Sequence, residues 1–241
     1  TQTQLDILGM NQVNVNDDSD TTYSVTGQAL TAPTTAWEVG DVKINGVDVY
    51  NTNIATDTFI GKLNTINSVT DVTGVRASAE FEYFIDATTF SGFSGVVTLT
   101  DDDGSTTANV TLSTASVAAN VTALNTGLDS VGGNLTAEAI GNQIRIFSDS
   151  DTDQTALTFT FNAAASANTT VAAAFTGLSG NTSAQQVNAA IQLESTGSSA
   201  IQIDAGEDIT SGTLGFQEAN VGVADFDSNG TGVSAGSTVS S

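Results

Sequence analysis

The sequence predicts an α+β fold made mainly of antiparallel β hairpins with short amphipathic helices, in two or three small lobes. Thr, Ser, Asn, Ala and Gly dominate the 241 residues, with a single proline and a single tryptophan. This composition favours many short strands joined by polar turns. Helical spacing follows one or two strands in three places, and hairpins replace long crossovers, which is typical of antiparallel sheets.

The clearest strand runs from Val75 to Ile85, where apolar residues occupy the odd positions and mostly polar or charged residues the even ones. Such alternation is typical of a half-buried strand. Glu80 and Glu82 share its polar side, and a carboxylate pair is what glycoside hydrolysis uses. A general acid needs burial or a neighbouring charge to raise its pKa. We therefore expect an exposed polar face here and no catalytic pair.

Turn residues between apolar runs predict three hairpins. The first joins 95–100 to 108–112 through Asp-Asp-Asp-Gly at 101–104, and the second spans 135–147 around Gly141-Asn142. Both turns contain residues that tolerate positive φ. The third would pair 191–193 with 201–203 across the small residues 195–199. One more strand is expected where Leu157, Phe159 and Phe161 alternate.

Three helices are expected from apolar residues at helical spacing. Asp57 would cap the first, whose apolar residues begin at Phe59 and end at Ile66. Ser113 or Thr114 would cap the second, which carries an apolar stripe from 117 to 128. The pattern Thr-Ser-Ala-Gln at 182–185 matches a capping box and predicts a third helix through 191.

The order of strand or hairpin, helix, and strand or hairpin thus recurs at about 41–86, 95–148 and 155–204. We expect a first lobe at 1–90 and a second β/α lobe at 91–154. The remaining range, 155–241, would hold a third unit of this kind followed by a Gly- and Ser-rich return segment.

The charge balance excludes several classes of partner. Acidic residues number 27 and basic residues 4, which gives a net charge of −23. A surface this negative repels phosphate backbones and anionic lipids, so we expect no nucleic-acid or membrane partner. No apolar run approaches the ~20 residues that a membrane helix needs.

The chain has no cysteine and no histidine. Disulfides, thiolate metal sites, zinc hydrolase motifs and Ser-His-Asp triads are therefore excluded. No other catalytic constellation or cofactor loop is recognisable, so we expect neither an enzyme nor a cofactor. The first residues show no signal-peptide pattern and no initiating Met, which favours a processed or internal piece of a longer protein.

Three acidic clusters are candidates for calcium. They are Asp101–Asp103, the aspartates at 149, 151 and 153, and the run Asp225, Asp227 and Asn229. The last run begins like a calcium loop, but its twelfth position is Gly236 and not a bidentate glutamate. We therefore expect solvated turns and no dedicated metal site, with Asp225, Asp227 and Asn229 as the weak candidate ligands.

Two short motifs lie within the first lobe. Asn45-Gly46 is a strong turn dipeptide because both residues tolerate positive φ, and it would reverse the chain between two short strands. Gly74 follows a helix and precedes the strand at Val75, which fits a helix C-cap.

The segment from Val42 to Ala77 resembles the repeat of bacterial flagellins and of some flagellar cap proteins that is named for its Ile-Asn pair. A looser match lies at 184–191 and 201–203. No long heptad helix is present, so the resemblance covers only the variable middle of a flagellin. The matching residues are Ile44, Asn45, Gly46, Ile66, Asn67, Thr73, Gly74, Val75 and Ala77.

The resemblance implies a secreted, surface-exposed structural subunit of the extracellular bacterial flagellum, which contributes to the filament surface and to motility. It implies other flagellin subunits as partners, through helices absent from this chain, and O-linked glycans on Ser or Thr. It also implies that Thr1 and Ser241 lie close together. A cap or hook-filament junction protein shares the repeat and stays an alternative, as does an adhesin or phage-fibre-like binding module.

Overall fold

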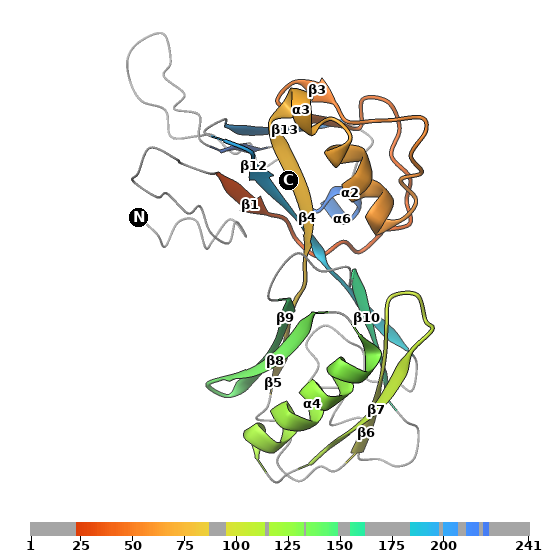
Figure 1. Ribbon diagram of the computed structural model, residues 1–241, viewed down its shortest axis with the longest axis vertical. Helices are drawn as coiled ribbons and strands as arrows, with labels where there is room; N and C mark the ends of the chain where they lie inside the picture. The colour runs from red at the N-terminus through yellow and green to blue at the C-terminus, as the bar shows by residue number, and fades with distance from the viewer. Residues whose placement is uncertain are drawn as a thin grey trace. The chain divides into compact units, whose positions relative to one another are not determined.

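The computed structural model describes residues 23–86, 95–113, 116–132, 134–148, 155–161, 184–197, 200–206, 211–216 and 219–221. The strands form four small, mostly antiparallel sheets with a few short helices, which confirms the predicted α+β class. The chain divides into two compact units (Figure 1), unit 1 with Thr1–Ser78 and Ala190–Ser241, and unit 2 with Ala79–Ala189. The lobe boundaries predicted at 90 and 154 fall on residues outside the described ranges, so that division stays a prediction.

Unit 1 contains two sheets. Sheet A has the order β1-β12-β4, with β1 (Ser24–Thr26), β12 (Ala190–Ser195) and β4 (Val75–Glu80). Sheet B has the order β14-β13-β2-β3, with β14 (Ala219–Val221), β13 (Ile201–Ala205), β2 (Val42–Ile44) and β3 (Val47–Asp48). The helices described in this unit are α2 (Phe59–Asn67), α3 (Thr70–Thr73) and α6 (Ser211–Leu214). Its buried side chains include Leu30, Trp37, Ile44, Ile66 and Ile191.

Unit 2 contains the other two sheets and a longer helix. Sheet C has the order β5-β9-β8, with β5 (Glu82–Asp86), β9 (Gln143–Ser148) and β8 (Leu135–Ile140). Sheet D has the order β11-β10-β6-β7, with β11 (Gln185–Asn188), β10 (Ala156–Phe161), β6 (Gly95–Thr100) and β7 (Thr107–Leu112). Helix α4 (Val117–Val131) packs against β6, β7 and β8 (Figure 1).

The core of unit 2 lies under α4. Leu124 and Leu128 of the helix are fully buried, as are Leu99 of β6 and Ile146 of β9. Gly127 permits the close approach of helix to sheet, because a Cβ there would lie 2.3 Å from Val110 Cγ2. The apolar residues of α4 thus pack on one face of sheet D, and this face forms part of the core.

Two of the three predicted hairpins are confirmed. β6 and β7 pair with Thr100 opposite Thr107, and β8 and β9 pair with Ile140 opposite Gln143. Gly104 and Gly141 have positive φ in the two turns. The predicted strand at 157–161 is β10.

The third predicted hairpin is wrong, because its two strands lie in different sheets. β12 pairs with β1 in sheet A, whereas β13 pairs with β2 and β14 in sheet B. The Oγ of Ser195, in the expected turn, accepts a hydrogen bond from the backbone N–H of Tyr23. Each strand thus lies between two others in its own sheet, β12 between β1 and β4, and β13 between β14 and β2.

The first two predicted helices form, but with different caps. Thr58 and not Asp57 caps α2, and its side chain accepts from the N–H of Gly61. Ser116 caps α4, whereas Asn120 binds both backbone groups of Ser113, and Thr114 lies outside the described residues. Residues 117 and 59 begin the helices in each case, so the residue directly before them takes the cap.

The third predicted helix is wrong. Gln185–Asn188 form β11 and Ala190–Ser195 form β12. Strand pairing overrides the capping-box pattern, because Phe159 of β10 lies opposite Gln185 and the buried Ile191 and Leu193 alternate along β12.

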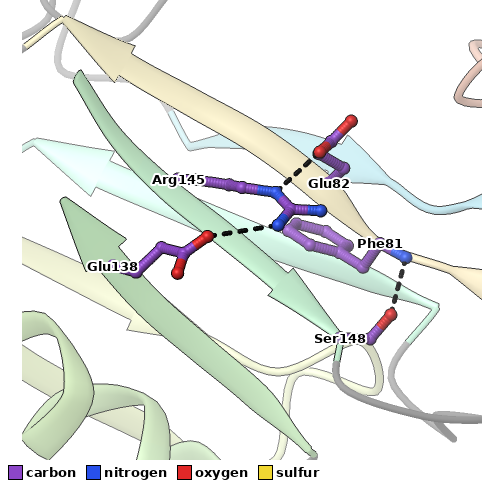
Figure 2. Close-up of polar contacts among 5 residues, drawn as sticks. All are labelled: Phe81, Glu82, Glu138, Arg145 and Ser148. Carbon is purple, nitrogen blue, oxygen red and sulfur yellow. Dashed lines mark hydrogen bonds and ion pairs between the residues drawn. The ribbon is translucent and has the colours of Figure 1, made fainter. Parts of the chain in front are cut away.

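The alternation from Val75 to Ile85 is confirmed, since each odd residue is buried. The run nevertheless contributes to two sheets, with β4 in sheet A and β5 in sheet C. Phe81 lies between the strands, and its N–H donates to Ser148 Oγ at 3.1 Å while its C=O accepts the Ser148 N–H at 3.0 Å. Figure 2 shows the side-chain contact, which secures the backbone where the chain changes sheets.

Candidate functional site

The Ile-Asn motif forms the turn between β2 and β3. Asn45 has φ of 52° and Gly46 has φ of 77°, and Ile44 pairs with Val47 across them. Asn tolerates the left-handed region better than most residues because its short side chain bonds locally, and Gly adopts it without strain. The turn predicted from the sequence is confirmed.

The side chain of Asn45 joins three segments of unit 1. Its Nδ2 donates to the carbonyl oxygens of Thr73 at 2.7 Å and Ala200 at 2.9 Å. Its Oδ1 accepts from the N–H of Gln202 at 2.8 Å, and its own N–H donates to the Gln202 carbonyl at 2.9 Å. The turn is thereby bound to the end of α3 and to β13.

The second part of the motif ends α3 and begins β4. Gly74 has a left-handed φ of 69°, and its N–H donates to the Thr70 carbonyl at 2.8 Å, which confirms the predicted C-cap. Thr73 Oγ1 accepts from the N–H of Val75 at 3.2 Å. The Gly74 carbonyl accepts from the N–H of Thr196.

Asn67 lies at the end of α2. Its side-chain amide binds both backbone groups of Ala77, as a neighbouring strand would do. Its Nδ2 donates to the Ala77 carbonyl at 2.9 Å, and its Oδ1 accepts the Ala77 N–H at 2.7 Å. Ile66 and Val75 are buried beside these groups in the chain. We call the set Ile44–Gly46, Ile66–Asn67, Thr73–Val75 and Ala77 the Asn45 corner.

The Asn45 corner contains no ionisable side chain and no cysteine. Its amide and hydroxyl groups are hydrogen-bonded to backbone groups. Burying those backbone groups without a partner would cost free energy. The arrangement therefore holds segments together and offers no nucleophile or general base. The sequence-predicted motif residues are brought to one place.

Unit 2 contains the same kind of contact, between a helix asparagine and both backbone groups of a strand alanine, at a position that the sequence analysis did not predict. Asn125 of α4 donates to the Ala137 carbonyl at 2.9 Å and accepts the Ala137 N–H at 2.6 Å. The signal in the sequence was an asparagine on a helix followed, within a dozen residues, by an alanine near the start of a strand.

Arg145 is the centre of an ion-pair network on sheet C. Its Nε lies 2.7 Å from Glu82 Oε1, and its Nη1 lies 3.2 Å from Glu138 Oε1 (Figure 2). Its guanidinium lies 4.2 Å from the centre of the Phe147 ring. Burial lowers the pKa of Arg145, but the hydrogen bonds and charges of the two glutamates raise it above its usual range. Glu82 thus pairs with a cation.

Lys62 of α2 is fully buried. Its Nζ donates to the carbonyl oxygens of Pro33 and Thr35, each at 2.7 Å, and to that of Thr56. The Trp37 ring lies 5.4 Å from the same nitrogen. Burial lowers the pKa of Lys62 to about 8, and the negative charge of Asp57, which raises this pKa, offsets the effect only in part. The three N–H donors of the ammonium form are matched by three carbonyl acceptors, whereas burial favours the neutral amine.

The first acidic cluster stabilises the β6–β7 turn. Asp101 Oδ2 accepts from Ser105 Oγ and from the N–H of Thr106, and Asp102 Oδ2 accepts from Thr155. Burial raises the pKa of Asp101, but these hydrogen bonds outweigh burial and lower it. The clusters at 149–153 and at Asp225, Asp227 and Asn229 lie outside the described residues, as do both termini.

Within the described ranges, no group of three or more acidic side chains is arranged to hold a metal ion. None of the helices there is long and apolar enough to span a membrane. A scan against protein-family models finds no match, and a search of curated proteins finds none. The flagellin resemblance therefore rests on the motif residues.

Proposed function

We propose that this chain forms the surface-exposed middle domains of a bacterial flagellin, a structural subunit of the extracellular flagellar filament. The observation that carries the proposal is the Asn45 corner. Every polar side chain of the motif is hydrogen-bonded to backbone groups, and those of Asn45 and Asn67 bind segments other than their own. A motif of this kind preserves a fold, which is what a repeat in a structural protein requires.

The distribution of charge supports a role at a wetted surface. The chain carries a net charge of −23. Lys62 is buried and Arg145 is paired with two glutamates, so these two of the basic residues do little to offset the acidic exterior. A strongly negative exterior limits non-specific association and keeps a dense polymer hydrated.

The test is to replace residues 1–241 in the parent protein by a short linker and to image the cells by electron microscopy. We expect filaments of smaller diameter and lower surface charge, because the polymerising helices lie elsewhere in a flagellin. A stable, exported subunit that forms no filament would contradict the proposal.

Labelling the chain on intact cells separates the flagellin from its alternatives. An antibody against residues 1–241 should decorate the whole filament. Decoration of the filament tip alone would identify a cap protein, and decoration at the hook would identify a junction protein. Labelling of the cell body without filaments would favour an adhesin. That the chain has no enzymatic activity stays a prediction.

A further inference from the structure

The four strands of sheet D carry no ionisable residue, although the chain has 27 acidic residues. The other sheets differ, because β4 and β12 contain Arg76 and Glu194, β2 and β3 contain Lys43 and Asp48, and sheet C contains the Arg145 network. Sheet D is thus an uncharged area in a strongly anionic molecule.

One face of sheet D packs in the core of unit 2, and the opposite face carries mainly polar side chains, with Val96 as an apolar exception. The buried residues Leu99, Val110 and Phe159 lie on the inner face. The register aligns the outer residues across the strands in rows. One row is Gln186, Thr158, Thr100 and Thr107, the next is Thr160, Thr98 and Asn109, and a further row holds Val96 opposite Thr111.

The outer face is accessible to solvent. Thr107, Asn109, Thr111 and Gln186 are exposed, and the threonines of the two central strands are partly exposed. The hydroxyl of Thr98 donates to Asn109 Oδ1 at 2.7 Å, so part of the array is ordered by its own hydrogen bonds. Hydroxyl and amide groups can each donate and accept, which makes such a face complementary to a second copy of itself.

We propose that the outer face of sheet D is a weak lateral contact between neighbouring copies of this chain. The inference rests on the proposed function, in which a filament holds many copies side by side. Copies with a charge of −23 repel wherever their acidic surfaces meet. Among the sheets that the structure describes, sheet D offers an uncharged face on which two copies can approach without that repulsion.

The area of the face fixes the strength of the contact. Four strands about 4.8 Å apart, each about 20 Å long, present roughly 300 Å². A stable interface buries roughly 800 Å² on each partner. The contact is therefore too small to hold a dimer in dilute solution, and it forms where copies are held at high local concentration, as in a filament. The aspartates at 101–103 border one end of the rows and disfavour overlap there.

Asn109→Asp and Gln143→Glu provide a matched pair of variants for the test. Each adds one negative charge with little change in size, at an exposed strand position. Asn109 lies on the outer face of sheet D, whereas Gln143 lies on β9 of sheet C. Sedimentation equilibrium of the full chain at millimolar concentration and moderate salt should show weak association. Asn109→Asp should weaken it about fivefold, and Gln143→Glu should leave it unchanged.

A second measurement uses the unaltered chain, so it does not depend on the folding of any variant. Amide chemical shifts should change with protein concentration in the strands of sheet D and stay constant in sheet C. Equal effects of the two variants, shifts spread over both sheets, or no association at millimolar concentration would overturn the proposal. Dextran is added in a parallel titration. If the amide chemical shifts of sheet D change with dextran and not with protein concentration, the face binds carbohydrate and the proposed contact between copies is wrong. None of these outcomes alters the deletion test of the filament role.

Discussion

Units 1 and 2 both bind a helix to a strand through an asparagine, but they are assembled from different parts of the chain. All strand pairs described in unit 2 lie within the continuous stretch Ala79–Ala189. Unit 1 pairs Ser24 with Glu194, so its sheets need both ends of the described chain. Closing such long loops costs conformational entropy before contacts compensate for it.

The polar groups in the two interiors differ as well. Unit 1 holds long loops through the buried ammonium of Lys62 and the side chain of Asn45. The core of unit 2 is formed by apolar residues of α4 and its sheets, such as Leu124 and Leu99. Both units have apolar cores, but among the described residues only unit 1 buries a charged side chain to less than 2% exposure, that of Lys62. The following predictions test this difference, from the largest effect to the smallest.

Lys62→Met should destabilise unit 1 and leave unit 2 unaffected. The substitution leaves the carbonyls of Pro33, Thr35 and Thr56 without their donor. We expect a loss of about 3 kcal/mol, since unpaired buried acceptors are costly, although a buried charge is also removed. Fluorescence of Trp37, the sole tryptophan, reports unit 1 during denaturant unfolding. Lys43→Met is the control, and an equal loss there would contradict the prediction.

Alkaline pH should affect the two units in opposite directions. Lys62 has a pKa of about 8 in the fold and 10.5 as its ordinary value, so the unfolded state binds more protons between these limits. The stability of unit 1 should rise over this window by at most roughly 3 kcal/mol. The rise should be absent from Lys62→Met, and a fall over the same window would show that the three carbonyls dominate over burial.

Burial raises the pKa of Tyr83 in unit 2 above its ordinary value of 10.0. The unfolded state therefore releases this proton first, and unit 2 should lose stability as the pH rises above about 10. Hydrogen exchange of the amides of α4 at increasing pH, after correction for intrinsic rates, measures the loss. Tyr83→Phe should remove the dependence, and a variant that keeps it would place the cause elsewhere.

Asn67→Ala and Asn125→Ala should weaken their own units by similar amounts. Each leaves an alanine N–H and C=O without the partners that the asparagine provides, at Ala77 and Ala137 respectively. A loss of about 1–3 kcal/mol is expected for each. Denaturation followed by Trp37 fluorescence for unit 1 and by hydrogen exchange for unit 2 compares them. A much larger loss in one unit would show that the two devices are not equivalent.

Arg145→Met should have the smallest effect. The ion pairs with Glu82 and Glu138 are partly exposed, with 28% of the Arg145 side chain accessible. Such pairs contribute up to about 1 kcal/mol and are screened by salt. The difference in unfolding free energy between Arg145→Met and the unaltered chain should shrink in 1 M NaCl. A difference that persists at high salt would instead point to packing on Phe147.

Several local features of the fold follow directly from the amino-acid sequence. The turn at Asn45-Gly46, the cap at Gly74 and the turns at Gly104 and Gly141 follow from which residues tolerate positive φ. The burial of alternate residues from Val75 to Ile85 follows from the period of a strand. These features depend on neighbours a few residues away, so one sequence carries enough information for them.

The pairing of distant segments, in contrast, depends on the complete fold. β12 and β13 are adjacent in the chain but enter different sheets, and Gln185 joins a strand despite its capping-box pattern. Asn67 and Asn45 find their partners only once β4 and β13 are in place, and the same holds for the carbonyls around Lys62. These choices depend on how backbone groups are satisfied and apolar area is buried across the whole unit. No local pattern encodes that competition.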